Sequence, residues 1–349
     1  GSVGFSFSIN EFYCMYIMHN ANKLNKPVPN YLTLVTTYLC TAACPNCCFN
    51  CSPKFPNPRK MTYDEMRDYI NQTAEVWETV KLIVFTGGEC TLLGKDLLLA
   101  IRHAKNKGLL TRVVTNGWWA RNDSQAMDMI ESLSDAGLDE INFSTGDEHS
   151  LHIPVSYVAK AAALCAEHHR FKSIVVNVES APGNAITTES WNTIDAIKGL
   201  SNDCRQQIRV ISSPWIFFRS VRPNEDIAIG KHKLFSNNKT GCPSILDSIT
   251  INPNGQFLSC CGLASEYSPF LKLGQVKSNM RALNEKRFHD ILKLWLYTDG
   301  PYNILKYIGE PSAVNRHKCE YCLNLLTSKS CLNKLLNISE NKIEQILLD

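Results

Sequence analysis

The sequence lacks several features that would place it in a simple class. Its charge is nearly balanced, with 36 Lys and Arg against 33 Asp and Glu in 349 residues, so composition gives no reason to expect nucleic-acid binding. No run of roughly 18 uncharged apolar residues is present, and a membrane-spanning helix needs about that length. Internal repeats and low-complexity tracts are also absent. We therefore expect a globular protein with neither a membrane anchor nor a nucleic-acid partner.

A secretion signal is missing as well, and this bears on the cysteines. Residues 5–18 contain Asn10 and Glu11 and have no basic flank, unlike a signal peptide. The chain nevertheless has 15 cysteines, five of them within Cys40–Cys51 and six within Cys242–Cys331. We expect a cytoplasmic protein, in which thiols stay reduced. Metal binding by two cysteine groups therefore explains this pattern better than disulfides do.

Between the two cysteine groups, short β-branched runs alternate with amphipathic stretches. The expected strands are 31–36, 81–85, 110–115, 138–144, 173–178 and 208–212. The expected helices are 62–80, 97–107, 124–136, 155–169 and 190–200. Strands separated by helices in this way predict a parallel α/β sheet built from βαβ units, either an open doubly wound sheet or a partial barrel.

The alternation of strands and helices stops after Pro214. Residues 241–332 are rich in turns and carry their own cysteines, so we place a domain boundary near residues 215–240. The expected units are an N-terminal extension (1–30), an α/β domain (31–225), a cysteine-rich domain (226–335) and a C-terminal surface tail (336–349).

The first cysteine group puts three thiols on one short loop after the first strand. The segment reads Cys40-Thr-Ala-Ala-Cys44-Pro-Asn-Cys47. Three thiolates can hold three corners of a 4Fe–4S cluster and leave the fourth iron for an outside ligand. A structural zinc ion would normally need a fourth protein ligand, which Cys48 or Cys51 could supply. Both interpretations stay open from this segment alone.

The second cysteine group is spread over a longer segment. Pro253-Asn254-Gly255 lies between two apolar runs and predicts a hairpin, which would bring Cys242 and Cys260 together. The later pair Cys319 and Cys322 could complete a four-thiolate site. On geometry alone, zinc and a 4Fe–4S cluster are equally good occupants.

The spacing of Cys40, Cys44 and Cys47 at the end of a first strand resembles the radical S-adenosylmethionine (radical SAM) superfamily. The resemblance implies a partial (β/α)6 TIM-like barrel and an enzyme whose 4Fe–4S cluster chelates S-adenosylmethionine. One electron then cleaves S-adenosylmethionine to a 5′-deoxyadenosyl radical, which removes a hydrogen atom from the substrate. A second register that runs from Cys44 to Cys51 also fits, but Cys40 lies directly at the strand end. The family usually has an aromatic residue where Asn46 stands.

The end of the second strand carries a further motif of that family. The resemblance implies that Gly87, Gly88 and Glu89 hold the methionyl amino group, because glycines allow a close backbone approach and a carboxylate suits an ammonium. The carboxyl ends of parallel strands share one rim. Further candidates on that rim, for the methionyl carboxylate or the ribose, are Asn116, Ser144 and Asp147. Turn and capping roles explain these three residues equally well.

The second cysteine group resembles the auxiliary-cluster modules of radical SAM enzymes, called SPASM and, in the shorter form, twitch. The full module uses seven cysteines for two clusters, but this region has six and lacks the Cys-x5-Cys-x3-Cys run. The resemblance therefore implies one auxiliary 4Fe–4S cluster in a twitch-like domain, with Cys261 and Cys331 as spare or alternative ligands. The implied ligands are Cys242, Cys260, Cys319 and Cys322.

The combined resemblance implies two 4Fe–4S clusters, S-adenosylmethionine and a flavodoxin- or ferredoxin-like electron donor. The expected activity is the modification of a ribosomal peptide, and the alternative is radical dehydrogenation of a small molecule such as an aminocyclitol. About 30 residues precede the first strand, too few for a leader-recognition domain, which weighs against the peptide hypothesis. A zinc-stabilised, non-catalytic binding protein is the alternative from another class. The sequence indicates no catalytic acid or base.

Overall fold

The structure is a computed structural model that describes residues 27–180, 183–214, 216, 240–277, 279–310 and 317–338. Most of the expected N-terminal extension, including Cys14, lies outside the described residues. So do the expected boundary between residues 225 and 226 and nearly all of the C-terminal tail. Among the helices that are described, none has both the length and the apolar character needed to cross a membrane.

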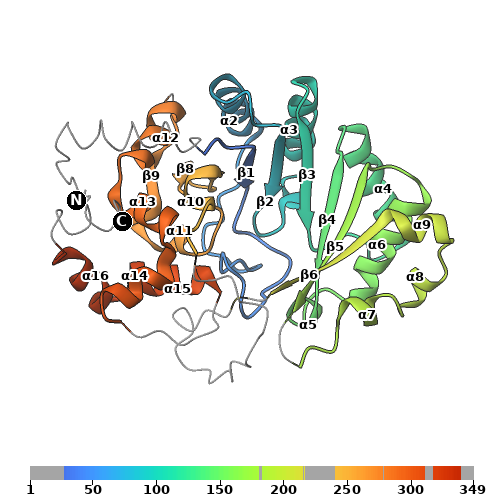
Figure 1. Ribbon diagram of the computed structural model, residues 1–349. Coiled ribbons are helices and arrows are strands. Elements are labelled where there is room, and N and C mark those ends of the chain that lie inside the picture. Colours follow the sequence, from blue (N-terminus) through green and yellow to red (C-terminus); the bar gives the residue numbers. More distant parts are fainter. Residues whose placement is uncertain are drawn as a thin grey trace.

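In the described part of the chain, nine strands form one continuous sheet (Figure 1). The order across it is β6-β5-β4-β3-β2-β1-β7-β8-β9, with β1 to β6 parallel and β7 parallel to β1. All six strands expected before Pro214 are present. The strands are β1 (Tyr31–Val35), β2 (Leu82–Thr86), β3 (Leu110–Thr115), β4 (Glu140–Thr145), β5 (Ser173–Ser180), β6 (Ile208–Pro214), β7 (Ile249–Ile251), β8 (Gln256–Leu258) and β9 (Lys272–Gln275).

Helices connect the parallel strands. They are α2 (Tyr63–Val76), α3 (Lys95–Asn106), α4 (Asp123–Asp135), α5 (Asp147–Ser150), α6 (Val155–Glu167), α7 (Thr188–Trp191), α8 (Asp195–Lys198) and α9 (Asn202–Gln207), with a 3-10 turn, η1, at Cys90–Leu93. The prediction of a single helix at 190–200 is wrong, because this segment contains two separate helices, α7 and α8. Ile194 between them has an extended backbone, and β-branched residues such as Ile194 are poor helix formers.

The order of the first six strands decides between the two sheet types that the sequence left open. A doubly wound sheet reverses its strand order at a switch point, whereas β1 to β6 follow one another without a reversal. Right-handed crossovers then place the connecting helices on one face. Buried Phe85, Val113 and Phe143 lie in the main core. This unidirectional order fits a partial barrel, and it brings six carboxyl strand ends to one edge.

The C-terminal segment adds β7 to the free side of β1 and then turns back through β8 and β9. Ile249, Ile251 and Phe257 of this hairpin belong to the main core. The remaining elements lie at the β9 end of the sheet (Figure 1), most of them around a second core that includes Leu271 and Trp295. They are α10 (Ser244–Asp247), α11 (Ala264–Tyr267), η3 (Pro269–Leu271), α12 (Met280–Phe288), α13 (Ile291–Thr298), α14 (Gly300–Tyr307), α15 (Lys318–Thr327) and α16 (Lys329–Leu336).

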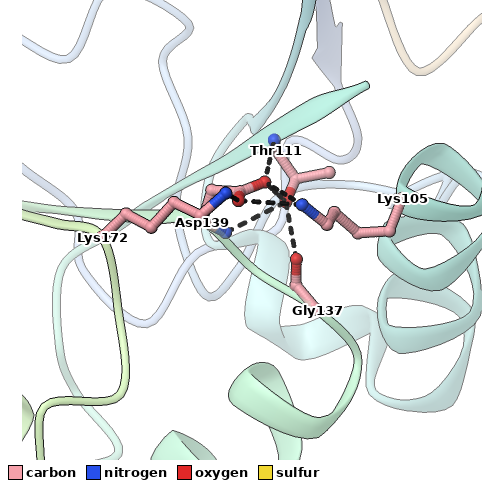
Figure 2. Close-up of polar contacts among 5 residues, drawn as sticks. All are labelled: Lys105, Thr111, Gly137, Asp139 and Lys172. Atoms are coloured by element: carbon pink, nitrogen blue, oxygen red, sulfur yellow. Dashed lines mark hydrogen bonds and ion pairs between the residues drawn. The ribbon is translucent and has the colours of Figure 1, made fainter. Parts of the chain in front are cut away.

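A buried ionic network ties the amino ends of β3 and β4 together, at the edge opposite the strand ends discussed below (Figure 2). Asp139 is 6% exposed, and its carboxylate lies 2.8 Å from Nζ of both Lys105 and Lys172. The Thr111 amide donates to it at 3.0 Å. Burial alone would raise the pKa of Asp139, but the lysines and this amide hold it below its usual range. The charge is therefore well compensated.

We expect Asp139→Asn to lower the free energy of unfolding by about 1–3 kcal/mol, because it removes a buried charge from its hydrogen-bonded lysines. The control Lys172→Met should cost less than about 1 kcal/mol, because the Lys172 side chain is 70% exposed. The folded-state pKa of Asp139 is lowered, so its contribution is present above the unfolded-state pKa of about 3.9 and lost at lower pH. The measurement is urea unfolding of both variants at neutral pH. An equal loss of stability in the two variants would contradict the role given to the buried Asp139 carboxylate.

Candidate cluster and cofactor site

The first cysteine loop is fixed by backbone contacts with the turn that follows β2. The Gly88 amide donates to the Thr37 carbonyl at 2.7 Å, and the Glu89 amide donates to the Leu39 carbonyl at 2.9 Å. A Cβ atom on Gly88 would stand 2.2 Å from the Leu39 carbonyl oxygen. Gly87 has a φ of +140°. The two glycines therefore permit the turn after β2 to approach the cysteine loop closely. From the sequence, we expected them to permit a close approach to a ligand instead.

Cys40, Cys44 and Cys47 come together in this loop. Burial, followed by the charge of the other two thiols, raises the pKa of Cys44, and Cys47 is among the neighbours that raise the pKa of Cys40. Donors reach the sulfur atoms: the Ala42 amide lies 3.4 Å from Sγ of Cys40, and the Cys51 amide lies 3.4 Å from Sγ of Cys47. Hydrogen bonds of this kind tune thiolate ligands of iron–sulfur clusters.

The three thiols differ in how readily they ionise. Burial, and after it the charge of Glu89, raises the pKa of Cys40 to about 12. A side-chain hydrogen bond with Cys51 lowers the pKa of Cys47 despite burial. Because the thiolate is the form that binds iron, thiols whose pKa is raised, such as Cys40 and Cys44, would release protons on metal binding.

Cys48 lies where the first cysteine loop meets the second core. It packs against that core, and its carbonyl accepts a hydrogen bond from the Tyr267 hydroxyl at 3.2 Å. Burial and, after it, the charge of Cys47 raise the pKa of the Cys48 thiol. The alternative register from Cys44 to Cys51 would use Cys48 as its middle ligand.

Glu89 is fully buried beside the cysteine loop. Its Oε1 accepts from the Thr91 and Thr115 hydroxyls at 2.6 and 2.9 Å, and its Oε2 accepts from the Asn116 amide at 2.8 Å. Burial raises the pKa of Glu89, and these hydrogen bonds oppose the rise. The Asn116 side chain also donates to Sγ of Cys40 at 3.6 Å. Asn116 thus joins the buried carboxylate to the first thiol.

The two remaining rim candidates lie in different surroundings. Ser144 is half-buried and alternates with Phe143, whose side chain lies in the core, so Ser144 faces the other side of the sheet. Asp147 accepts from the Ala185 and Ile186 amides, both at 2.7 Å. These contacts anchor the segment after β5 and favour the turn role for Asp147.

The sequence reasoning missed one residue of this rim, Glu179. It is 3% exposed at the end of β5, and its Oε2 lies 2.6 Å from Nδ1 of His149. The neighbouring Glu148 accepts from the Asn46 amide of the cysteine loop at 2.7 Å. Asn46, which replaces the family's usual aromatic residue, is therefore held by a carboxylate. The signal in the sequence that could have identified Glu179 is its position, as a charged residue at the end of a strand.

The second cysteine group also converges. Burial is the main cause of the raised pKa of Cys322, and the charges of Cys260, Cys319 and Cys242 raise it further. Cys319 and Cys242 are also among the charges that raise the pKa of Cys260, and Cys242 is among those that raise the pKa of Cys319, after burial in both cases. A Cβ atom on Gly262 would lie 3.1 Å from Sγ of Cys319 and 3.5 Å from Sγ of Cys260. The four thiols named from the sequence thus lie near one another.

The two other cysteines of this region differ. The Cys261 thiol is hydrogen-bonded to Tyr31 but is also among the charges that raise the pKa of Cys260 and of Cys319. The Cys331 thiol lies near Ser328 and Glu310. Across the residues described here, no three His, Cys, Asp or Glu side chains are gathered closely enough to hold a single metal ion. Each cysteine of a 4Fe–4S cluster binds a different iron, so its ligands need not meet at one point.

A profile of the radical SAM superfamily matches residues 34–208, which is 175 of 349 residues. YydG of Bacillus subtilis, a putative peptide biosynthesis protein, is 24% identical over 119 residues, 34% of this chain and 36% of YydG. PqqA peptide cyclase of Bradyrhizobium diazoefficiens is 29% identical over 117 residues, 34% of this chain and 28% of the cyclase. The chain thus spans about a third of the length of either relative.

Two solved structures align over longer stretches. BtrN in complex with AdoMet and 2-DOIA is 10% identical, with 85% of this chain and 92% of BtrN covered and a TM-score of 0.47. SuiB of Streptococcus suis bound to S-adenosylmethionine is 15% identical, with 98% of this chain and 81% of SuiB covered and a TM-score of 0.41.

We expect Gly88→Ala to disrupt the cysteine loop, because its Cβ atom would overlap the Leu39 carbonyl. After anaerobic reconstitution, the variant should hold less than about half the iron of the unmodified protein, and it should unfold at a lower temperature. Gly199→Ala is the matched control, since Gly199 has a helical backbone and its nearest contact would be 3.4 Å. Equal iron content in both variants would show that the close contact at Gly88 is dispensable.

Proposed function

We propose that this chain, which belongs to the radical SAM superfamily, is an enzyme that uses S-adenosylmethionine and a 4Fe–4S cluster, and that Cys40, Cys44 and Cys47 hold that cluster. The observation that carries this assignment is the convergence of the three thiols under N–H donors at the end of β1. Three protein ligands leave one iron open for an outside ligand. In the family that ligand is S-adenosylmethionine.

The proposed S-adenosylmethionine site lies on the same edge of the sheet. Glu89 is its main anchor: a buried carboxylate with only neutral hydrogen-bond donors suits the methionyl ammonium. In the described part of the chain Glu89 forms no ion pair that would already compensate its charge. Two further residues are proposed to contact S-adenosylmethionine: Asn116, beside Cys40, and Ser144, on the face of the sheet opposite Phe143. Gly87 and Gly88 place the Glu89 backbone.

We also propose that Cys242, Cys260, Cys319 and Cys322 hold an auxiliary 4Fe–4S cluster in a twitch-like domain. The donor set fits, because the other three thiols all act on Cys322 and the missing Cβ atom of Gly262 leaves room beside two sulfurs. Full ligation by four cysteines leaves no open iron. Such a cluster suits electron transfer better than direct binding of a substrate.

The reaction class follows from these assignments. The cofactors supply reductive cleavage of S-adenosylmethionine to a 5′-deoxyadenosyl radical, and an auxiliary cluster gives a second electron a place to go. Loss of one hydrogen atom, one electron and one proton from the substrate is a net two-electron oxidation or a bond-forming cross-link. The protein's part is to place both cysteine groups beside one sheet. We expect a flavodoxin- or ferredoxin-like donor.

The proposed substrate is a ribosomally made peptide. Support comes from the two relatives with partial matches, which are described as a putative peptide biosynthesis protein and a peptide cyclase. Oxidation of a small molecule such as an aminocyclitol is the alternative. The two substrate classes differ in a property that can be measured directly, their sensitivity to proteases.

Replacing the cysteines should separate the two clusters. We expect about eight irons per chain in the reconstituted protein. Cys44→Ala should retain about four irons and lose 5′-deoxyadenosine formation with dithionite and S-adenosylmethionine. Cys260→Ala should also retain about four irons, yet it should still form 5′-deoxyadenosine slowly. The control is Cys165→Ala. Cys165 is buried within α6, and burial alone raises the pKa of its thiol, with no contribution from another cysteine.

The same measurements also test the alternative hypotheses. About four irons in the unmodified protein, lost in Cys260→Ala but not in Cys44→Ala, would contradict the proposed first cluster. Zinc in place of iron after anaerobic purification would support the non-catalytic binding protein.

The substrate class can be tested with fractions of a cell extract smaller than about 10 kDa, a limit chosen to retain short peptides. We expect one fraction to raise 5′-deoxyadenosine formation and to lose this effect after protease treatment. Mass spectrometry should then show a peptide lighter by two hydrogen atoms. A stimulating fraction that resists proteases would instead support the small-molecule dehydrogenase.

A further inference from the structure

One buried cation lies next to the second cysteine group. Arg287, on α12, has no exposed surface. Its Nε donates to Oδ1 of Asn284 at 2.8 Å, and Nη1 donates to the Ser248 carbonyl at 2.6 Å and to the Ser259 carbonyl at 3.4 Å. All of these acceptors are neutral. Burial lowers the pKa of Arg287 to about 10, so the side chain stays cationic at neutral pH.

Arg287 forms no ion pair within the part of the chain that the structure describes. The rings of Phe257 and Phe288 lie 5.7 and 5.9 Å from its guanidinium carbon and give partial compensation. A fully buried charge is costly without a counter-charge. The fold therefore maintains a positive charge that its own hydrogen bonds do not neutralise.

The place of Arg287 indicates what the charge serves. The carbonyl that it contacts at Ser259 belongs to the peptide bond that leads into Cys260, and Cys260 is within electrostatic range of the guanidinium. Asp247, partly exposed on α10, is the other main charge acting on Arg287, and it also acts on Cys242. As thiols, the four cysteines carry no charge, but as cluster ligands they are deprotonated and negative.

We infer that Arg287 is the counter-cation of the auxiliary cluster and sets its reduction potential. The inference rests on the proposed cluster at Cys242, Cys260, Cys319 and Cys322. Reduction adds one negative charge to a group that is already negative. A fixed positive charge in a desolvated place stabilises the reduced form more than the oxidised form, which raises the potential. Arg287 is thus a positioning residue that acts through charge, without being a ligand.

Charge variants of the holoenzyme separate this electrostatic role from a packing role. Arg287→Gln removes the cation, and Arg287→Lys is the matched control that keeps it. Asn284→Asp leaves Arg287 in place but gives it a carboxylate partner. Asp247→Asn removes the opposing negative charge from a partly exposed position. The measurement is a redox titration of the auxiliary cluster followed by electron paramagnetic resonance, with S-adenosylmethionine present to displace the signal of the first cluster.

We expect Arg287→Gln and Asn284→Asp each to lower the ratio of reduced to oxidised auxiliary cluster by roughly tenfold at a fixed potential, equivalent to about 59 mV for one electron. Arg287→Lys should shift the ratio much less, and Asp247→Asn should shift it in the opposite direction. An unchanged potential in Asn284→Asp and Asp247→Asn, with full iron content, would overturn the role of Arg287 even if Arg287→Gln failed to fold.

Failure of the proposed cluster has a different signature. If the unmodified protein held only about four irons and gave one signal, the auxiliary cluster itself would be wrong, and the inference would fall with it. If two signals were present and the four variants shifted neither potential, only the assignment of Arg287 would be overturned.

Discussion

The contact of Gly88 with the backbone of the first cysteine loop constrains the rest of the site. No side chain fits between the end of β2 and the Leu39 carbonyl, so the turn and the loop are held at hydrogen-bonding distance. That contact fixes Cys40 at the rim and places the Glu89 carboxylate under the Asn116 amide. A loop that carries three thiols would otherwise be free to move. Its geometry is thus set by a neighbouring strand end, which is rigid because it belongs to the sheet.

The second constraint is that both cysteine groups belong to one sheet. β7 pairs with β1, the strand that leads into the first cysteine loop. Two tyrosines strengthen the connection: Tyr38 donates to Glu266 at 2.9 Å, and Tyr267 donates to the Cys48 carbonyl at 3.2 Å. The groups are therefore fixed relative to each other by backbone pairing and by these partly buried hydrogen bonds. Two electron-transfer centres whose separation must stay constant would need such a connection.

Much of this arrangement could be predicted from the sequence, for identifiable reasons. Mostly buried β-branched runs such as 173–178 are unambiguous, and the cysteine spacings reflect ligand geometry on short loops. The pairing of the three-residue strand β7 with β1 could not be predicted, because it depends on a contact between distant segments. The same holds for Glu179 with His149 and for Asp147 with the amides after β5. The burial of Arg287 could not be predicted either, since a lone arginine in a helix is expected to lie on the surface.

The central claim is that the two cysteine groups hold two clusters, of which only the first has an open iron. Electron paramagnetic resonance of the dithionite-reduced protein, with and without S-adenosylmethionine, tests it most directly. The account predicts two overlapping signals, one of which changes when S-adenosylmethionine is added while the other stays constant. A single signal, or two signals that both remain unchanged, would contradict it.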